Sequence, residues 1–139
     1  MIKFYRTDDR KIHEEGGIVP GGWIDMVNPT VAEGELIAKR LQIDIQDLLA
    51  ALDEEESSRV ELEDIPTIEI RHDKEAYTTI PLGIILTQDI IITICTEETP
   101  VLQAFVNGRV KEFSTKKKMR FVYQILFRVA ALYQNDLRV

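Results

Sequence analysis

Residues 80–95, which read IPLGIILTQDIIITIC, decide the fold of this chain. Two apolar runs, 80–87 and 90–95, are separated only by the polar pair Gln88 and Asp89, which is the spacing of a β-hairpin. Neither run alternates apolar with polar residues, and this pattern is typical of strands that are buried on both faces. We therefore expect these two strands to lie at the centre of a covered sheet.

Further strands are expected on the N-terminal side of this hairpin. Residues 2–6 and 10–14 could form an opening hairpin around residues 7–9, and 23–27 is a compact apolar strand. After Glu56 the pattern changes to an alternation of apolar and polar residues. Val60 with Leu62, and Ile68 with Ile70, therefore predict two half-buried strands.

Two short helices are predicted between these strand regions. Leucine and isoleucine residues recur at helical spacing over 31–41 and 44–53, with a break between the two segments. Thr30 is the natural N-cap of the first helix, and Glu33, three residues later, completes a capping box.

The last part of the chain predicts a short helix after Pro100 and a long one from about 115 to 139. Of the thirteen residues 121–133, only Gln124 and Arg128 are polar, although a surface helix needs just one apolar stripe. The run is too short to cross a bilayer, which takes about 20 residues. We therefore expect protein to cover it, partly its own sheet and partly an oligomer contact or sequence downstream of this chain.

Size and composition predict one acidic α/β domain that spans residues 1–139. The formal net charge of −7 opposes binding to nucleic acid, which depends on lysine and arginine contacts. The cluster of Lys116, Lys117, Lys118 and Arg120 is either a solvated first helical turn or an anion-binding patch. Cys95 is the only cysteine, which excludes an intrachain disulfide and fits a buried thiol in a reducing compartment.

Motifs that would indicate an enzyme are absent from the sequence. It contains no glycine-rich nucleotide loop, no phosphate-binding loop, no zinc-protease motif and no serine-hydrolase elbow. His13 and His72 have no partner at metal-ligand spacing, and Trp23 fits a core position better than a ligand-stacking one. We predict that the chain is not an enzyme and has no catalytic residues.

The acidic run 53–56 is the remaining candidate for chemistry. It places four carboxylates at the end of a predicted helix, where the helix dipole is already negative. One interpretation is a solvated acidic turn that Arg59 partly offsets. The other is a weak divalent-cation site at Asp53 and Glu54, because Mg²⁺ is commonly bound by one or two carboxylates and retained waters.

Three segments occur in an order that is found in one known family. They are the run WIDMVNPT at 23–30, the helix end and following strand at 49–61, and the hairpin with its lead-in at 77–95. Together they resemble the cytoplasmic domain of CorA-like magnesium and cobalt transporters. This resemblance implies an α/β/α sandwich with a mixed, largely antiparallel sheet and a long C-terminal helix.

The resemblance also carries functional expectations. Such transporters are pentamers in the cell membrane, and their last cytoplasmic helix continues into a stalk and two membrane helices with a Gly-Met-Asn pore motif. That motif is absent here, so the chain would be a cytoplasmic sensing and gating domain that cannot itself conduct Mg²⁺ or Co²⁺. Residues from about 115 onward would begin the stalk helix.

Regulatory metal binding is a further implication of the resemblance. In some relatives, acidic residues near the end of the second helix help to bind regulatory divalent ions between subunits. Ala50 stands where one such carboxylate would lie, and Asp53 and Glu54 follow one turn later. The alternative to a transporter domain is a free-standing cytoplasmic interaction module that oligomerises through its C-terminal helix.

Overall fold

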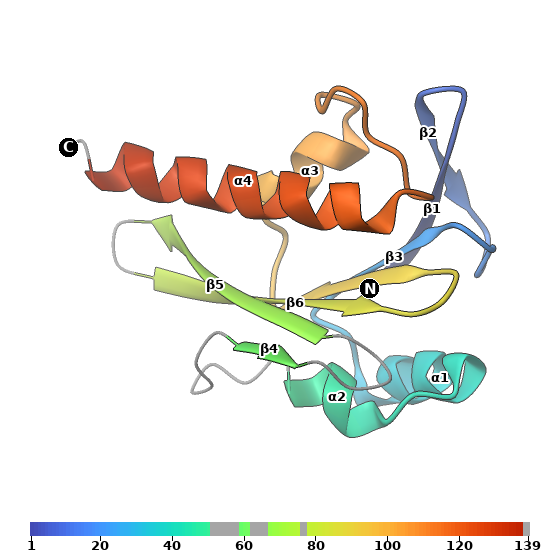
Figure 1. Cartoon of the computed structure of the whole chain (residues 1–139). Coiled ribbons are helices and arrows are strands. Elements are labelled where there is room, and N and C mark those ends of the chain that lie inside the picture. The colour runs from blue at the N-terminus through green and yellow to red at the C-terminus, as the bar shows by residue number, and fades with distance from the viewer. Residues whose placement is uncertain (51–58, 62–66, 76–77, 138–139) are drawn as a thin grey trace.

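The computed structural model describes the backbone of residues 1–50, 59–61, 67–75 and 78–137, and the side chains of residues 1–50 and 82–131 (Figure 1). Within these residues, seven strands form one sheet in the order β2-β1-β3-β7-β6-β5-β4. The strands are β1 (Ile2–Asp8), β2 (Lys11–Glu15), β3 (Trp23–Val27), β4 (Arg59–Glu61), β5 (Thr67–Glu75), β6 (Thr78–Leu86) and β7 (Ile91–Cys95).

The direction of the strands agrees with the mixed, largely antiparallel sheet that was expected. Only β3 and β7 run parallel among the paired strands of the described chain, and the other pairs are antiparallel. A parallel pair needs a long crossover, and here the chain passes through helices and three strands between β3 and β7. This crossover puts β7 in the middle of the sheet.

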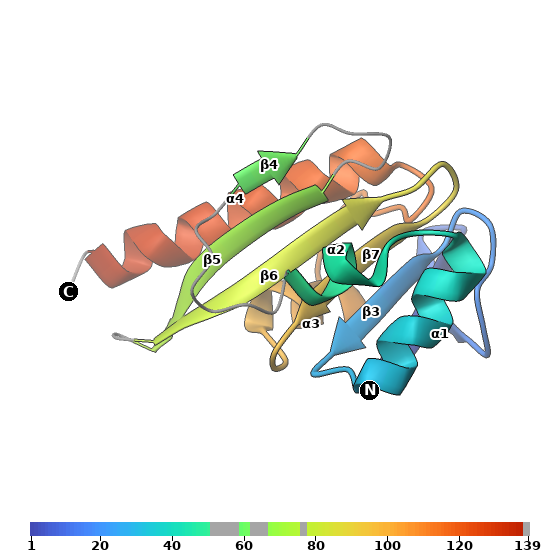
Figure 2. The same ribbon diagram turned by 90° about the horizontal axis from the view of Figure 1, so that it is seen from below.

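Helices cover both faces of the sheet, which confirms the α/β/α sandwich (Figures 1 and 2). One face carries α1 (Val31–Leu41) and α2 (Ile45–Ala50), and the other carries α3 (Pro100–Val106) and α4 (Lys118–Leu137). In Figure 2, α1 and α2 lie in front of the sheet and α4 lies behind it.

The central hairpin is buried on both faces, as its apolar sequence predicts. Every residue of β7 is buried, and so is every residue from 82 to 86 in β6. Alternate side chains serve the two faces: Ile92 and Ile94 belong to the core beneath α1 and α2, whereas Ile91 and Cys95 belong to the core beneath α3 and α4. A strand with this double burial cannot carry a polar face.

The helix starts follow from local hydrogen bonds. The amide of Glu33 donates to Thr30 Oγ1 at 3.1 Å, and the amide of Thr30 donates to Glu33 Oε1 at 2.9 Å, so the predicted capping box is confirmed. Gln42 ends α1 in the left-handed region, with φ 55°. The second predicted helix is observed over Ile45–Ala50, and its predicted end at 51–53 lies outside the described residues.

Two predicted boundaries were wrong. The opening hairpin turns at Asp9 and Arg10, with φ of 49° and 66°, and not over residues 7–9, because a two-residue turn with positive φ matches the twist of the strands. The last helix begins at Lys118 and not at 115. Thr115 instead donates its amide to Thr7 Oγ1 at 2.9 Å, which holds the approach to α4 against β1.

Candidate functional site

One face of α4 packs into the core of the domain. Its buried residues are Phe121, Val122, Ile125 and Val129, and the recurrence of 121, 125 and 129 at four-residue steps places them on one side of the helix. The ring of Phe121 meets that of Trp23 edge to face, at 4.9 Å between centroids. This contact makes α4 an integral part of the α/β/α sandwich.

The opposite face of α4 carries large apolar side chains that no described residue covers. Tyr123 is 65% exposed, Phe127 is 77% exposed and Met119 is 52% exposed. Their four-residue spacing forms a second stripe on the same helix, which we call the outer stripe of α4. The expectation of a final helix with apolar residues beyond those that its own sheet covers is therefore confirmed.

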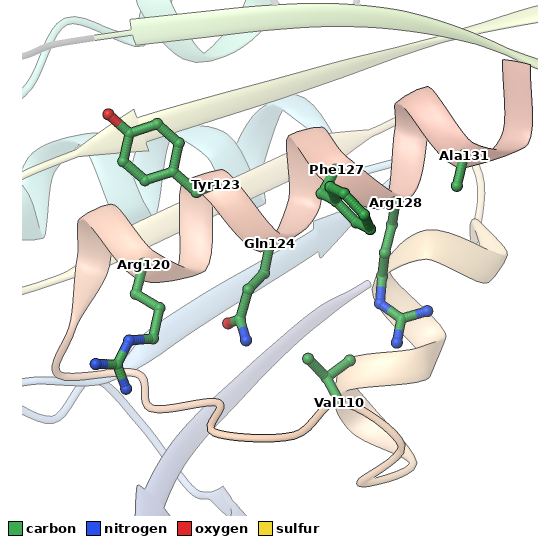
Figure 3. Close-up of a pocket in the computed structure, with 7 residues that line it drawn as sticks. All are labelled: Val110, Arg120, Tyr123, Gln124, Phe127, Arg128 and Ala131. Carbon is green, nitrogen blue, oxygen red and sulfur yellow. The ribbon is translucent and has the colours of Figure 1, made fainter. Parts of the chain in front are cut away.

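A groove of about 780 Å³ runs beside this stripe (Figure 3). Apolar and aromatic side chains make most of its surface, and two arginines and one amide add polar groups. In Figure 3, Arg120, Gln124 and Arg128 all extend from α4 toward the segment that contains Val110. The groove is lined by Val110, Arg120, Tyr123, Gln124, Phe127, Arg128 and Ala131.

The polar groups of the groove are held in place by the neighbouring segment. Arg120 donates to the carbonyl of Glu112 at 3.4 Å, and Gln124 Nε2 donates to the carbonyl of Lys111 at 2.9 Å. The guanidinium of Arg128 lies 5.8 Å from the centroid of the Phe105 ring. An apolar stripe beside fixed arginines suits contact with another protein segment, and the described residues show no group there that could perform chemistry.

The groove also contains a hydrogen-bond acceptor without a partner. Gln124 Oε1 is the only buried side-chain oxygen or nitrogen without a hydrogen bond among the described side chains. A buried acceptor that stays unpaired costs free energy, on the order of 1–3 kcal/mol.

The predicted metal residues, Asp53 and Glu54, lie outside the described residues. The structure therefore tests neither the acidic-turn interpretation nor the divalent-cation site. Within the described part of the chain, no group of three or more histidine, cysteine, aspartate or glutamate residues could hold a metal ion. His13 is exposed on β2, and the side chain of His72 is not described.

Sequence reasoning missed a buried polar network in the centre of the sheet. Trp23 Nε1 donates to Thr93 Oγ1 at 2.8 Å, and the Thr93 hydroxyl donates to Asp25 Oδ1 at 3.3 Å. Asp25 is only 3% exposed, and its burial raises the pKa of its carboxyl group to about 6. The hydrogen bond from Thr93 lowers this pKa, and repulsion from Glu98 raises it. An aspartate inside an otherwise apolar strand was the signal for this network.

The roles expected for two core residues are confirmed. Trp23 is 1% exposed and packs against Tyr5 and Phe121, so it is a core residue and not a surface for ligand stacking. Cys95 is fully buried, and burial raises the pKa of its thiol, which keeps the sulfur protonated and unreactive.

No helix in the described part of the chain is long and apolar enough to cross a membrane. The chain spans between 32% and 59% of the length of these relatives that it matches.

Known proteins are similar to this chain in both sequence and fold. It is 31% identical over 105 residues to the cobalt/magnesium transport protein CorA of Methanocaldococcus jannaschii, a match that covers 73% of this chain and 32% of that protein. The solved soluble domain of CorA from the same organism superposes with a TM-score of 0.80 at 23% identity, covering 99% of this chain and 59% of that one.

A second solved structure extends the likeness of fold. The cytoplasmic domain of ZntB from Vibrio parahaemolyticus superposes with a TM-score of 0.72 at 12% identity, covering 98% of this chain and 60% of that one. At such identities the two superpositions show the fold alone. Membership rests on the sequence: residues 21–138 match the family described as CorA-like Mg²⁺ transporter protein, and the chain therefore belongs to that family.

Proposed function

We infer that this chain is the cytoplasmic regulatory and gating domain of a transporter that moves Mg²⁺, and also Co²⁺, across the cell membrane. The observation that carries this proposal is the family match, which spans residues 21–138 and thus nearly the whole domain. The relative with 31% identity is named as a transport protein for both ions. Ion conduction would belong to the part of the parent protein that this chain does not span.

In this proposal, the outer stripe of α4 is the surface through which the domain contacts the rest of the parent protein. Tyr123 and Phe127 stay exposed while the other side of the same helix is buried in the core. We assign α4 as the first part of the stalk helix, and its outer stripe as the contact with neighbouring subunits of a homo-oligomer, a pentamer in the full-length protein. Burial of large aromatic side chains is a strong source of association free energy.

Regulation would come from the carboxylates that follow α2. In this proposal, Mg²⁺ binds at Asp53 and Glu54 where two domains face each other, and neutralises their mutual repulsion. Because a ligand stabilises the state that it binds, bound Mg²⁺ favours a closed arrangement, and its loss lets the stalks move.

Thermal unfolding tests the metal site directly. A ligand at a hundredfold excess over its Kd stabilises the folded state by about 2.7 kcal/mol, so millimolar Mg²⁺ should raise the melting temperature of the assembled, stalk-containing domain. The double variant Asp53→Asn with Glu54→Gln should lose this rise. Glu35→Gln, at an exposed position on α1, is the matched control and should keep it.

Two outcomes would rule out regulation by a metal ion at Asp53 and Glu54. One is a melting temperature and an oligomeric state that Mg²⁺ and Co²⁺ leave unchanged. The other is a metal-dependent rise that persists in the double variant, because the ion would then bind elsewhere.

A free-standing interaction module is the second candidate, and the exposed outer stripe of α4 also favours it. The gene sequence after Val139 separates the two functions. A long charged helix followed by two apolar runs supports the transporter, whereas a stop codon supports the module.

A further inference from the structure

A second concave surface, of about 740 Å³, lies where the β1–β2 turn meets the segment that leads into α4. It is formed by residues that are distant in the sequence, 7–10 on one side and 108–120 on the other. In Figure 1 this segment, drawn in orange, descends beside the β1–β2 hairpin to the start of α4. We call this surface the basic cavity, because of the charges that line it.

Cations outnumber carboxylates in the basic cavity, although the chain as a whole has a net charge of −7. Among the described residues, none of these cations forms an ion pair with a carboxylate, and the lining carboxylate of Asp8 already pairs with Arg6 at 3.6 Å. The cations that line the cavity are Arg10, Lys111, Lys116, Lys117 and Arg120, and the carboxylates are Asp8, Asp9 and Glu112.

The frame that carries these cations is fixed by buried hydrogen bonds. The amide of Thr7 donates to Thr115 Oγ1 at 3.1 Å, and the amide of Thr115 donates to Thr7 Oγ1 at 2.9 Å. These reciprocal bonds join β1 to the approach of α4. A site whose backbone is already ordered loses less conformational entropy when it binds a ligand.

Lys116 and Lys118, two lysines of the basic cluster 116–120, have different roles. Lys118 donates to the carbonyls of Thr87 and Gln88, so its ammonium group caps the turn between β6 and β7. The stem of Lys116 lies over Gly21, where its Cγ is only 3.1 Å from the place of an added Cβ. Lys118 is therefore structural, whereas Lys116 keeps a supported stem and lines the cavity.

The start of α4 adds positive potential to the same place. Its first turn contains no acidic residue, and Lys118 and Arg120 lie where the helix dipole is already positive. This arrangement is unfavourable on its own, and a bound anion would offset it. The dipole supplements the side-chain cations and does not by itself define a site.

We propose that the basic cavity binds the phosphate groups of a small multivalent anion, either inorganic pyrophosphate or the phosphate tail of a nucleotide. Lysine and arginine are the side chains that recognise phosphate, through charge and through charge-assisted hydrogen bonds. The volume lies in the range of about 300–1,000 Å³ that small-molecule sites occupy. The anion-binding interpretation of the basic cluster is thereby assigned to Lys116, Lys117 and Arg120, and Lys118 is excluded from it.

Isothermal titration calorimetry of this chain with pyrophosphate and, separately, with adenosine triphosphate tests the proposal. The double variant Lys111→Gln with Lys117→Gln should bind the phosphate compounds at least about tenfold more weakly, because two charge-assisted contacts are lost. Lys39→Gln, which removes an exposed lysine from α1 on the other face of the sheet, should bind as the unmodified chain does. Binding should also weaken as sodium chloride is added.

The same experiment identifies the source of the phosphate. Equal affinity for both compounds assigns recognition to the phosphates alone, whereas tighter binding of adenosine triphosphate adds a contact with the nucleoside. Phosphate binding that the double variant retains in full would overturn the proposal. An absence of heat with both compounds would also overturn the proposal. It would do so even if vesicles of anionic lipid bound to the same lysines.

Discussion

Asp25 is a carboxylate at the centre of the sheet, on the strand that runs parallel to β7. Its carboxyl group accepts one hydrogen bond from Thr93, and burial outweighs this bond in setting the pKa. Glu98 raises the pKa further, whereas Lys3 and the N-terminal ammonium group lower it. The folded state therefore holds the proton of Asp25 more tightly than the unfolded chain does.

This difference predicts how stability depends on pH. The pKa of Asp25 rises from 3.8 to about 6 on folding, so its ionisation destabilises the fold as pH increases through that interval. The loss begins near pH 4, is complete above about pH 6, and amounts to about 3 kcal/mol. Below pH 4 the group is protonated in both states and contributes nothing.

The variant Asp25→Asn isolates this effect, because an amide can still accept the Thr93 hydrogen bond without a charge. We expect the variant to be more stable than the unmodified chain above pH 6, by up to about 3 kcal/mol, and the difference to shrink toward pH 4. Urea unfolding across this pH range measures it. A difference that is constant with pH would show that the pKa of Asp25 is the same in the folded and the unfolded state.

At the scale of a single element, α4 has two apolar stripes with different tasks. The buried stripe, which contains Phe121, Ile125 and Val129, fills the core next to Trp23, and the outer stripe lies beside the groove. Phenylalanine occurs in both, with Phe121 fully buried and Phe127 77% exposed. This pair provides a matched comparison within one helix.

We expect Phe121→Ala to destabilise the isolated domain by about 3–5 kcal/mol, because a buried ring is removed and a cavity is left. Phe127→Ala should change stability by no more than about 0.5 kcal/mol in the same measurement. Chemical denaturation of both variants provides the test. Equal losses would mean that the outer stripe is buried in the isolated chain, and the docking role of α4 would then be withdrawn.

The sequence predicted some elements well because their signals are local. Apolar residues at every position of 90–95 except Thr93 indicated a strand buried on both faces, and Thr30 with Glu33 indicated a helix start. The turn at Asp9 and Arg10 was missed because both residues have positive φ values and neither is a glycine, the residue that usually marks such a turn. The start of α4 was misplaced because Thr115 bonds to Thr7, a partner 108 residues away.

At the scale of the whole molecule, the sheet order brings together residues that no spacing in the sequence connects. The parallel pairing of β3 with β7 sets Asp25 opposite Thr93, and the packing of β1 against the approach to α4 forms the basic cavity. Neither arrangement has a local sequence signal. The apolar excess of residues 121–133 did have one, and it indicated correctly that α4 carries apolar side chains that the core of this domain does not cover.

Family membership links these features to one proposed task. A domain with its own core on both sheet faces, and with one apolar stripe left exposed on its last helix, suits a regulatory unit attached to a larger assembly. Under this proposal, the exposed Tyr123 and Phe127 of α4 are contact residues for the rest of that assembly. It also places the proposed metal and phosphate ligands on a domain that could pass their binding on to a pore.

Ion flux through the full-length parent protein tests whether that protein is a transporter of Mg²⁺ and Co²⁺. The protein would be purified and reconstituted in lipid vesicles that contain a Mg²⁺-sensitive dye, with protein-free vesicles as the control. We expect Mg²⁺ influx above that of the protein-free vesicles. When Co²⁺ replaces Mg²⁺ and is read with a dye for that ion, we expect Co²⁺ influx above the same control. Influx equal to that of protein-free vesicles for both ions, from a correctly folded and inserted protein, would contradict the proposal that it is such a transporter.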